Sequence, residues 1–419
     1  MQIKHVFRCG AMVFSGLMLF GARVSVANAA VLETGLDLPK LTGPYATGTT
    51  YYQLLDSNRD ETFTPDPLDK RQLALQIWYP AATAGTQPAS YIPSPLSEVP
   101  DFGLLNLVRP QSFLDVALAG DQAAYPILLF SHGFGELSQT YTAQAEELAS
   151  HGYIVASVTH SFDALVAGLP DGQIIPLDPN LAADFANPST YESASIAETK
   201  LRAADLQFVL DELDKLNASD PQNLLTGKLD LEKIGVFGHS LGGATAAEAM
   251  RIDDRFDVGL NLDGSMWGEV VETGLDRPFM LMNSENAFLS DSSKQSFFSN
   301  STGDRYNLSL EGAKHHNFAD APFLAPLFAE AGVTSPYQVG SIDPNRGAEL
   351  INQYTLAFFD QYLKGQPNSL LTSPSPYDEV DFEFRSATSQ DVPESEAVLG
   401  LVLLGAGWCW QKSRMRQIG

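Results

Sequence analysis

The chain has 419 residues, 44% of them hydrophobic, and its 25 Lys and Arg against 51 Asp and Glu give a formal net charge of −26 at pH 7. This length is enough for one large domain with insertions or for two small domains. A chain this acidic is repelled by nucleic acid and by anionic surfaces, which excludes them as partners and favours a small neutral or zwitterionic substrate.

The first 29 residues have the pattern of a secretory signal peptide. Lys4 and Arg8 precede an apolar stretch that is short for a membrane span, and the small residues at 27–29 provide a cleavage site. We therefore expect the chain to be exported, to the periplasm, cell envelope or exterior of a bacterium. The two cysteines are Cys9, in this signal, and Cys409, near the other end, so the body has no disulfide, thiolate nucleophile or cysteine-bound metal.

Residues 30–385 are expected to form one domain in which apolar runs alternate with helical patterns. The runs are apolar throughout rather than at every second residue, as in strands that are covered on both faces. This alternation predicts a mostly parallel central sheet flanked by helices, with functional sites beyond the carboxyl ends of the strands. Strands are expected at 73–79, 125–131, 153–159, 233–238, 258–263, 278–284 and 306–313, and helices at 138–152, 195–217, after Ser240, and at 346–365.

Two insertions, at about 83–122 and 161–194, are expected to roof the site as lids. The first contains an apolar group that is either exposed and lid-like or packed into a core: Phe102, Leu104, Leu105, Leu107, Val108 and Phe113. The second is acidic and rich in Pro and Asn.

Ser240 lies in the stretch GHSLGG, directly after the apolar run KIGVF and before a run of small residues that reads as a helix. A nucleophilic serine on a strained strand-to-helix turn needs glycine two residues before and two residues after it, because strand and helix pass closely there. Gly238 and Gly242 fill these positions. The sequence therefore predicts that Ser240 is a nucleophile.

A serine hydroxyl needs a base to take its proton, and only two histidines follow Ser240 in the chain. They are the adjacent His315 and His316, in the loop after the strand expected at 306–313. One of them is expected to be the base. Two acids stand at strand ends between nucleophile and base, Asp263 and Glu285, and their spacing leaves both open as the group that orients the base.

The negative charge that develops on an ester oxygen needs two backbone N–H donors. Leu241, just after the serine, is expected to supply one, and Phe134, in the stretch HGFG after the strand 125–131, the other. His132 in the same stretch is expected to brace the loop rather than to act in catalysis.

Five segments in this order resemble the platelet-activating-factor acetylhydrolase family of secreted serine esterases, over about residues 70–365: LLFSHGFG, GHSLGGAT, GLNLDGSMW, FMLMNSE and HHNFAD. The resemblance implies the α/β-hydrolase fold and phospholipase-A2-like cleavage of short acyl esters through an acyl-enzyme, with no cofactor and no metal. It also assigns the orienting acid to Asp263 and the base to His315, with His316 in the variable position of the motif.

Two other functions stay open. Lipases and cutinase-like polyester hydrolases share much of the serine motif, and an inactive scaffold of the envelope or matrix could keep the fold without activity. A dienelactone hydrolase would have cysteine in place of Ser240, which argues against that reaction.

The C-terminal end has a flexible linker at 386–396 and an apolar and basic segment at 397–419 that ends on Lys412, Arg414 and Arg416. A short apolar segment with a cationic end is held at an inner membrane. It is similar to the PEP-CTERM sorting tail of exported bacterial proteins, with Ser395 where the usual motif has proline. The similarity implies membrane association through the tail and processing by an exosortase.

Overall fold

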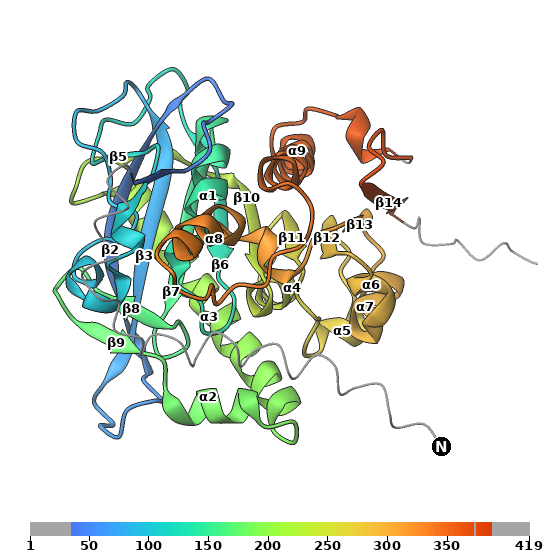
Figure 1. Ribbon diagram of the computed structural model, residues 1–419, viewed down its shortest axis with the longest axis horizontal. Coiled ribbons are helices and arrows are strands. Elements are labelled where there is room, and N and C mark those ends of the chain that lie inside the picture. The colour runs from blue at the N-terminus through green and yellow to red at the C-terminus, as the bar shows by residue number, and fades with distance from the viewer. Residues whose placement is uncertain (1–34, 373, 388–419) are drawn as a thin grey trace, which may run out of the picture.

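The computed structural model describes residues 35–372 and 374–387, drawn in colour in Figure 1. The signal peptide expected at 1–29, the tail at 397–419 and most of the linker lie outside the described residues. Within the described part, no helix combines the length and apolarity required to cross a membrane.

A ten-stranded sheet runs through the centre of the molecule (Figure 1), in the order β14-β13-β12-β11-β10-β6-β7-β3-β2-β5. The six strands from β13 to β7 are parallel. β3 pairs antiparallel with β7 and β2, and β14 pairs antiparallel with β13, whereas the short β5 pairs parallel with β2. The strands are β2 (Ala46–Asp60), β3 (Lys70–Ala81), β5 (Phe113–Leu114), β6 (Tyr125–Ser131), β7 (Ile154–His160), β10 (Leu229–His239), β11 (Val258–Leu262), β12 (Phe279–Ser284), β13 (Arg305–Leu310) and β14 (Val380–Arg385). Two short pairs stand apart, β1 (Leu36–Asp37) with β4 (Val108–Arg109) and β8 (Val166–Gly168) with β9 (Ile174–Pro176).

Helices cover both faces of this sheet. They are α1 (Thr142–Ser150), α2 (Pro179–Ala186), α3 (Tyr191–Ala218), α4 (Leu241–Ile252), α5 (Val270–Thr273), α6 (Ala287–Ser290), α7 (Ser292–Asn300), α8 (Ala321–Glu330) and α9 (Pro344–Leu363). Single 3₁₀ turns are η4 (Leu96–Glu98), η5 (Pro100–Phe102), η6 (Leu105–Leu107), η7 (Ser138–Tyr141), η8 (His315–Phe318) and η9 (Ser369–Leu371).

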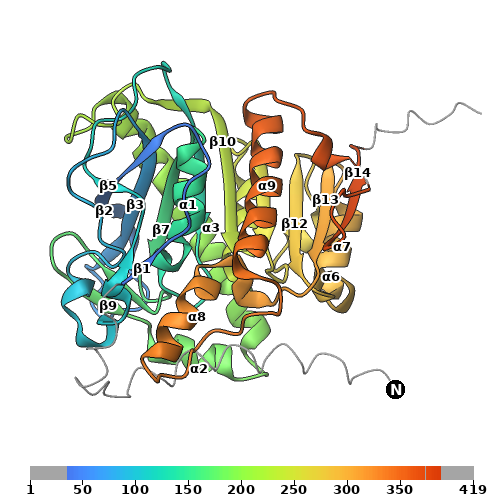
Figure 2. The ribbon, with the colours of Figure 1, turned by 45° about the horizontal axis from the view of Figure 1, so that its top comes forward.

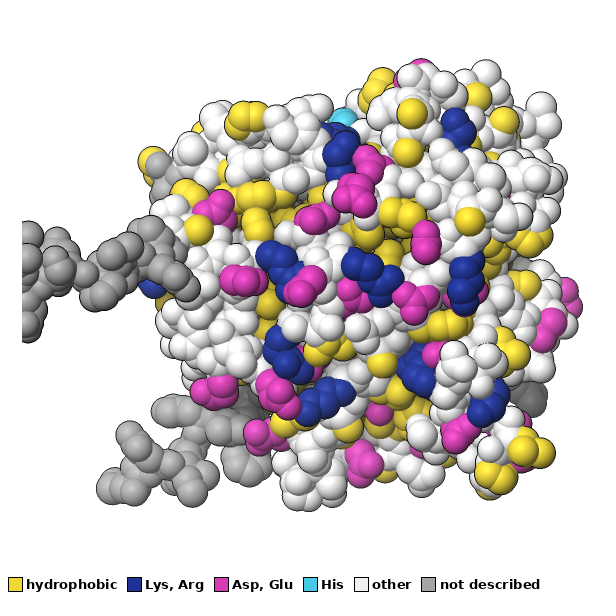
Figure 3. All heavy atoms as spheres, turned by 180° about the vertical axis from the view of Figure 1, so that it is seen from behind, with side chains coloured by type: hydrophobic (Ala, Val, Ile, Leu, Met, Phe, Trp, Pro, Cys, Tyr) yellow, Lys and Arg dark blue, Asp and Glu magenta, His cyan; other side chains and the backbone are white. Residues whose placement is uncertain are grey.

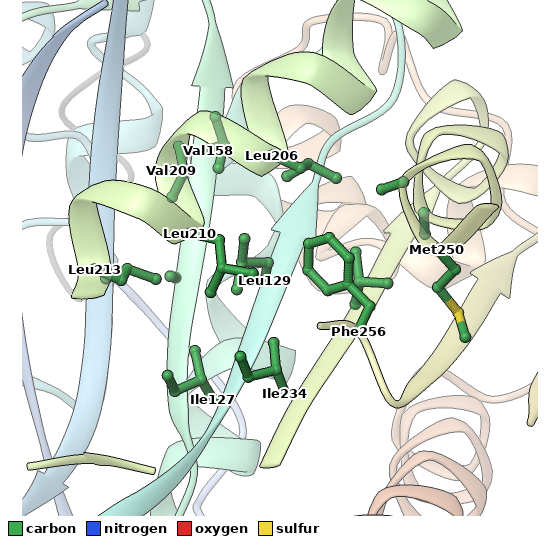
Figure 4. Close-up of a cluster of buried hydrophobic side chains, with 14 of the residues drawn as sticks. Ile127, Leu129, Val158, Leu206, Val209, Leu210, Leu213, Ile234, Met250 and Phe256 are labelled. Atoms are coloured by element: carbon green, nitrogen blue, oxygen red, sulfur yellow. The ribbon is translucent and has the colours of Figure 1, made fainter. Parts of the chain in front are cut away.

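The core has two halves, one on each face of the sheet, because successive side chains of a strand point to opposite faces. Ile127 and Leu129 of β6 pack with α3 and α4, whereas Leu128 and Phe130 pack with α1 and α9. Figure 4 shows the first half, where Leu206, Leu210 and Leu213 of α3 face the strands. Figure 2 shows α9 lying across the other face. These three layers confirm the predicted α/β-hydrolase fold.

The strand order reverses at β6. The chain passes from β6 to β7 on one side and later returns to β10 on the other, so β6 and β10 are neighbours with diverging connections. In open α/β sheets such a switch point opens a crevice at the carboxyl ends of the strands. Here Gly238, two residues before Ser240, pairs with Ser131, one residue before the loop that begins at His132.

The first insertion is not an exposed lid. Phe102, Leu105 and Val108 are buried in a cluster with Leu137 and Leu324, while Leu104, Leu107 and Phe113 are partly buried. The apolar side chains of this stretch form a small core of their own, because together they cover one another and one side of α8.

The surface carries its charges in pairs despite the net acidity. Arg255 lies between Asp211 and Asp253, at 2.7 and 2.6 Å, and Arg251 contacts Glu248 at 2.7 Å. Figure 3 shows basic and acidic side chains side by side on the face opposite to that of Figure 1. Most of the basic side chains there have acidic neighbours, so that face does not form a continuous positive surface.

Candidate active site

Ser240 lies between the end of β10 and the first residue of α4, in a backbone conformation of φ 56° and ψ −122°. Such a conformation is costly for a residue with a side chain and is typical of the nucleophile turn of hydrolases. The turn is held from the sheet, because the N–H of Ser240 donates to the carbonyl of Leu262 at 2.9 Å.

Close packing explains the glycines beside Ser240. A Cβ atom on Gly242 would lie 2.0 Å from the carbonyl oxygen of Ser131, and one on Gly238 would lie 2.3 Å from the backbone of Gly242. Both clashes are with backbone atoms, which cannot move aside. The two positions that the sequence pattern singled out are therefore those where strand, helix and the end of β6 touch.

A cavity of about 510 Å³ opens over Ser240. All the residues that the sequence predicted for the site line it: Phe134, Ser240, Leu241, Asp263, Glu285, His315 and His316. They come from the loops after β6, β10, β11, β12 and β13, which all end at the same edge of the sheet.

His315 and Asp263 are directly bonded. The Nδ1 atom of His315, at the start of η8, lies 2.8 Å from Oδ2 of Asp263, and the side chain of Asp263 is only 4% exposed. Ser284 holds the other carboxylate oxygen, since its N–H donates to Oδ1 at 2.8 Å and its hydroxyl lies 3.0 Å from both oxygens. With Nδ1 donating to the carboxylate, Nε2 of His315 is the nitrogen left to accept a proton.

Burial raises the pKa of Asp263, but the charge of Lys294 and the hydrogen bond from His315 outweigh burial and hold this pKa below its ordinary value. Asp263 is therefore ionised throughout the neutral range. Lys294 was not predicted from the sequence, because a lysine on α7 between serines has no pattern that separates it from a surface lysine.

The two runner-up residues have other partners. Glu285 is exposed and accepts the N–H of Gly312 at 3.1 Å. His316 accepts the N–H of Gln338 on Nδ1 and approaches Glu136 with Nε2, at 3.1 and 3.3 Å. Burial opposes a charge on His316, but Glu136 raises the pKa of this imidazole overall.

Two backbone N–H groups beside Ser240 are free. Among the described residues, none accepts a hydrogen bond from the N–H of Phe134 or of Leu241. Leu241 is the first residue of α4, where backbone N–H groups lack helical partners and the helix dipole is positive. The arrangement fits the predicted pair of donors for an anionic oxygen.

His132 braces the loop that carries Phe134. It is buried, its Nδ1 donates to the carbonyl of Gly133 at 2.7 Å, and its Nε2 accepts the N–H of His160 at 3.2 Å. Burial lowers its pKa well below the ordinary value, so it is neutral. The buried Arg202 holds the same loop, donating to the carbonyl of His132 at 2.6 Å while it pairs with Asp163.

A second link joins this loop to the histidine loop. Tyr141 Oη accepts the N–H of Gly133 at 3.2 Å and bonds Nδ1 of His239 at 2.8 Å, and Nε2 of His239 lies 3.0 Å from the carbonyl oxygen of His315. Burial keeps the pKa of His239 well below its ordinary value, so a neutral ring accepts on Nδ1 and donates from Nε2. Sequence reasoning missed this role of His239, the variable position of the serine motif.

One wall of the cavity is aromatic. The ring of Phe134 stacks on Phe185 of α2 with centroids 3.6 Å apart, Phe185 meets Tyr191 edge to face, and Tyr191 meets Trp267 in the same way at 5.6 Å. Phe185 and Tyr191 belong to the second insertion, which was expected to roof the site, but these two aromatic residues were not singled out from the sequence.

Comparison with known proteins identifies the family. The family model described as "Platelet-activating factor acetylhydrolase, isoform II" matches residues 31–169 and 199–371. The platelet-activating factor acetylhydrolase of Cavia porcellus is 29% identical over 365 residues, 78% of each chain. A probable 1-alkyl-2-acetylglycerophosphocholine esterase of Arthroderma benhamiae is 25% identical and covers 86% of this chain and 97% of its own length.

A solved structure agrees with this assignment. The ferulic acid esterase from Streptomyces cinnamoneus superposes with a TM-score of 0.70 and 30% sequence identity, covering 83% of this chain and 99% of its own. The family model, these relatives and this solved structure each match most of the chain. The chain belongs to the platelet-activating factor acetylhydrolase, isoform II, family and is a serine ester hydrolase.

Proposed function

We propose that Ser240, His315 and Asp263 form the catalytic triad and that the chain cleaves short acyl esters of small neutral or zwitterionic lipids. The observation that carries this proposal is the 2.8 Å bond between His315 and Asp263 at the cavity over the strained Ser240. In a triad of this kind the acid orients the base, and the base takes the proton of the serine.

In the proposed reaction Ser240 Oγ attacks the ester carbonyl while its proton passes to Nε2 of His315. The ester oxygen becomes an anion stabilised by the N–H groups of Phe134 and Leu241, each worth about 3–4 kcal/mol. As the C–O bond to the alcohol breaks, His315 returns the proton to the leaving alkoxide, which leaves an acyl-serine. Water, deprotonated by the same imidazole, then releases the acid and restores Ser240.

Charge and size favour the proposed substrate. More acidic than basic side chains line the cavity, so an anionic substrate is disfavoured. The acids are Glu136, Asp263, Glu285 and Asp291, and the lysines are Lys294 and Lys314. A volume of about 510 Å³ is in the range of ordinary small-molecule sites. The names of the relatives, acetylhydrolase and acetylglycerophosphocholine esterase, support an acetyl ester.

A second candidate is hydrolysis of aromatic esters or polyesters, in the manner of cutinases. The aromatic wall of Phe134, Phe185, Tyr191 and Trp267 favours it, because flat rings stack well on such surfaces. The ferulic acid esterase among the solved structures points the same way.

The test is hydrolysis of p-nitrophenyl esters from acetate to palmitate, beside methyl ferulate, by the full chain. We expect a maximum at short chains and activity at least 10³-fold lower in Ser240→Ala and in His315→Ala. The matched control His316→Ala should keep most of the wild-type activity. If His316→Ala is inactive and His315→Ala is active, His316 is the base instead of His315. Highest activity on long-chain esters would favour a lipase, and a preference for methyl ferulate would favour the second candidate. A wild-type chain that folds but hydrolyses none of the esters would favour an inactive scaffold.

We also propose that the chain is exported and kept at the cell envelope of a bacterium. The support is the signal-like residues 1–29 and the apolar and basic residues 397–419. Terminal sequencing of envelope and medium fractions tests this: we expect an N-terminus at Ala30 and, if an exosortase acts, loss of the tail. An unprocessed chain in the cytoplasm would contradict the proposal.

A further inference from the structure

A buried lysine lies beside the acid of the proposed triad. Nζ of Lys294 is 3.6 Å from Oδ1 of Asp263, and the lysine side chain is only 3% exposed. A buried cation is costly unless it is paired, and such groups recur where they act on a neighbour. Lys294 takes no part in the steps derived above.

The structure fixes this lysine from two sides. Its Nζ donates to Oδ1 of Asn283 at 2.8 Å. The amide of Asn283 is oriented in turn, because its Nδ2 donates to Oδ1 of Asn307 at 2.9 Å and to the carbonyl of Leu308 at 3.2 Å. From the other side, Asp291 caps α7 by accepting the N–H of Ser293 at 2.9 Å, which sets the first turn that carries Lys294.

The two oxygens of Asp263 share the hydroxyl of Ser284 but otherwise face different groups. Oδ1 faces the N–H of Ser284 and the ammonium of Lys294, and Oδ2 faces His315. These contacts at Oδ1 orient the carboxylate so that Oδ2 points toward the imidazole of His315. It also places a positive charge on the side away from His315, so part of the carboxylate charge is compensated before the imidazole meets it.

We propose, on the basis of the triad assigned above, that Lys294 is a positioning residue that fixes Asp263 toward His315 and offsets part of the charge of its carboxylate. A carboxylate at 2.8 Å stabilises a protonated imidazole strongly, and a base that is protonated cannot accept the proton of Ser240. A cation on the far oxygen weakens this attraction without removing the hydrogen bond. The lowered pKa of Asp263 is consistent with the contact.

Other ionisable groups also face His315 and belong to separate elements. The rings of His239 and His316 lie 4.4 and 5.4 Å from its ring, centroid to centroid. Charged groups also line the cavity, from the loops after β6, β12 and β13 and from the cap of α7: Glu136, Glu285, Asp291 and Lys314. All of these stay unchanged when Lys294 alone is replaced, so a shift between variants reports on the lysine.

The test is the pH dependence of kcat/KM for p-nitrophenyl acetate between pH 4.5 and 9, measured on the full chain. Lys294→Gln keeps a donor for Asn283 and loses the charge, whereas Lys294→Arg keeps the charge. We expect the midpoint of the acid limb to rise by about one pH unit in Lys294→Gln, from the Coulomb energy of a charge a few ångströms away, and to move by less than about 0.3 in Lys294→Arg. Lys200→Gln, which removes an exposed lysine paired with Glu269, is the control for net charge and should leave the profile in place.

A uniform loss of activity at every pH, with an unmoved midpoint in Lys294→Gln, would overturn the proposal and leave a packing role. If Lys294→Gln does not fold, Asn283→Asp is the second variant, because it keeps Lys294 and adds a carboxylate that competes for its charge. The midpoint of the acid limb should then rise in the same way. An unchanged midpoint in Asn283→Asp also overturns the proposal. Failure of the triad itself is distinguishable, because wild type and Lys200→Gln would then show no turnover that depends on Ser240.

Discussion

Replacing Asp263 by Asn should reverse the proton positions on His315. The N–H and hydroxyl of Ser284 and the ammonium of Lys294 surround Oδ1, and they are all donors. An asparagine must therefore place its oxygen at the Oδ1 position and its NH₂ group at the Oδ2 position, facing Nδ1 of His315. Nδ1 then has to accept, the ring proton moves to Nε2, and the imidazole can no longer take the proton of Ser240.

The expected loss is about 10³- to 10⁴-fold in kcat, or about 4–5.5 kcal/mol of transition-state stabilisation. KM should change little, because the hydroxyl, the two N–H donors and the cavity are untouched. The assay is steady-state hydrolysis of p-nitrophenyl acetate, with thermal unfolding as a check on folding. Asp276→Asn, whose side chain is 82% exposed, is the matched control and should behave as wild type. A folded Asp263→Asn variant that keeps more than about a tenth of wild-type kcat would refute the reasoning and return Glu285 to consideration.

Two further predictions concern the supports of the site, and a third concerns Glu146, a buried acid on α1 that accepts the N–H groups of Gln111 and Ser112. Gly242→Ala places a Cβ atom 2.0 Å from the carbonyl of Ser131. We therefore expect the free energy of unfolding, measured in urea, to fall by about 3 kcal/mol. An unchanged free energy of unfolding would mean that the turn relaxes to accept the methyl group. Tyr141→Phe removes the hydroxyl that joins the N–H of Gly133 to His239. It should lower kcat about tenfold with little change in KM. A change in KM alone would indicate that Tyr141 contacts the substrate instead. Burial raises the pKa of Glu146 from 4.5 to about 7, so the folded state binds more protons than the unfolded state in this range and the free energy of unfolding falls as pH rises from 4.5 to 7. Glu146→Gln should remove on the order of 3 kcal/mol of that fall in unfolding measured at pH 4.5 and 7.5, and an identical fall in the variant would contradict the assignment.

The parallel part of the fold could be predicted from sequence because its strands are buried on both faces. The runs at 125–131 and 278–284 are continuous and apolar, and they coincide with β6 and β12 within one residue. The turn at Ser240 could be located because its glycines are dictated by backbone contacts that permit no other residue.

Two of the antiparallel strands, β2 and β14, were missed, whereas β3 was expected at 73–79. β2 reads ATGTTYYQLLDSNRD and is half polar, since it lies near one edge of the sheet, and its pairing with β3 is decided by tertiary contact rather than by local pattern. β14 has a regular alternation in VDFEFR that could have been recognised.

The site was predictable as far as residue type and chain order specify it. Asp263 and Glu285 both follow strands, and only the structure shows that one is bonded to His315 while the other is exposed. Lys294 and Tyr141 could not be found from sequence, because each acts through a contact between segments that are far apart in the chain.

The central claim is that Ser240 is the nucleophile, and the most direct measurement is covalent labelling by a fluorophosphonate, followed by intact mass and peptide mapping. The account predicts one adduct per chain, on Ser240, formed in step with loss of esterase activity and strongly slowed in Asp263→Asn. An adduct on another residue, or full activity in a chain labelled at Ser240, would contradict it.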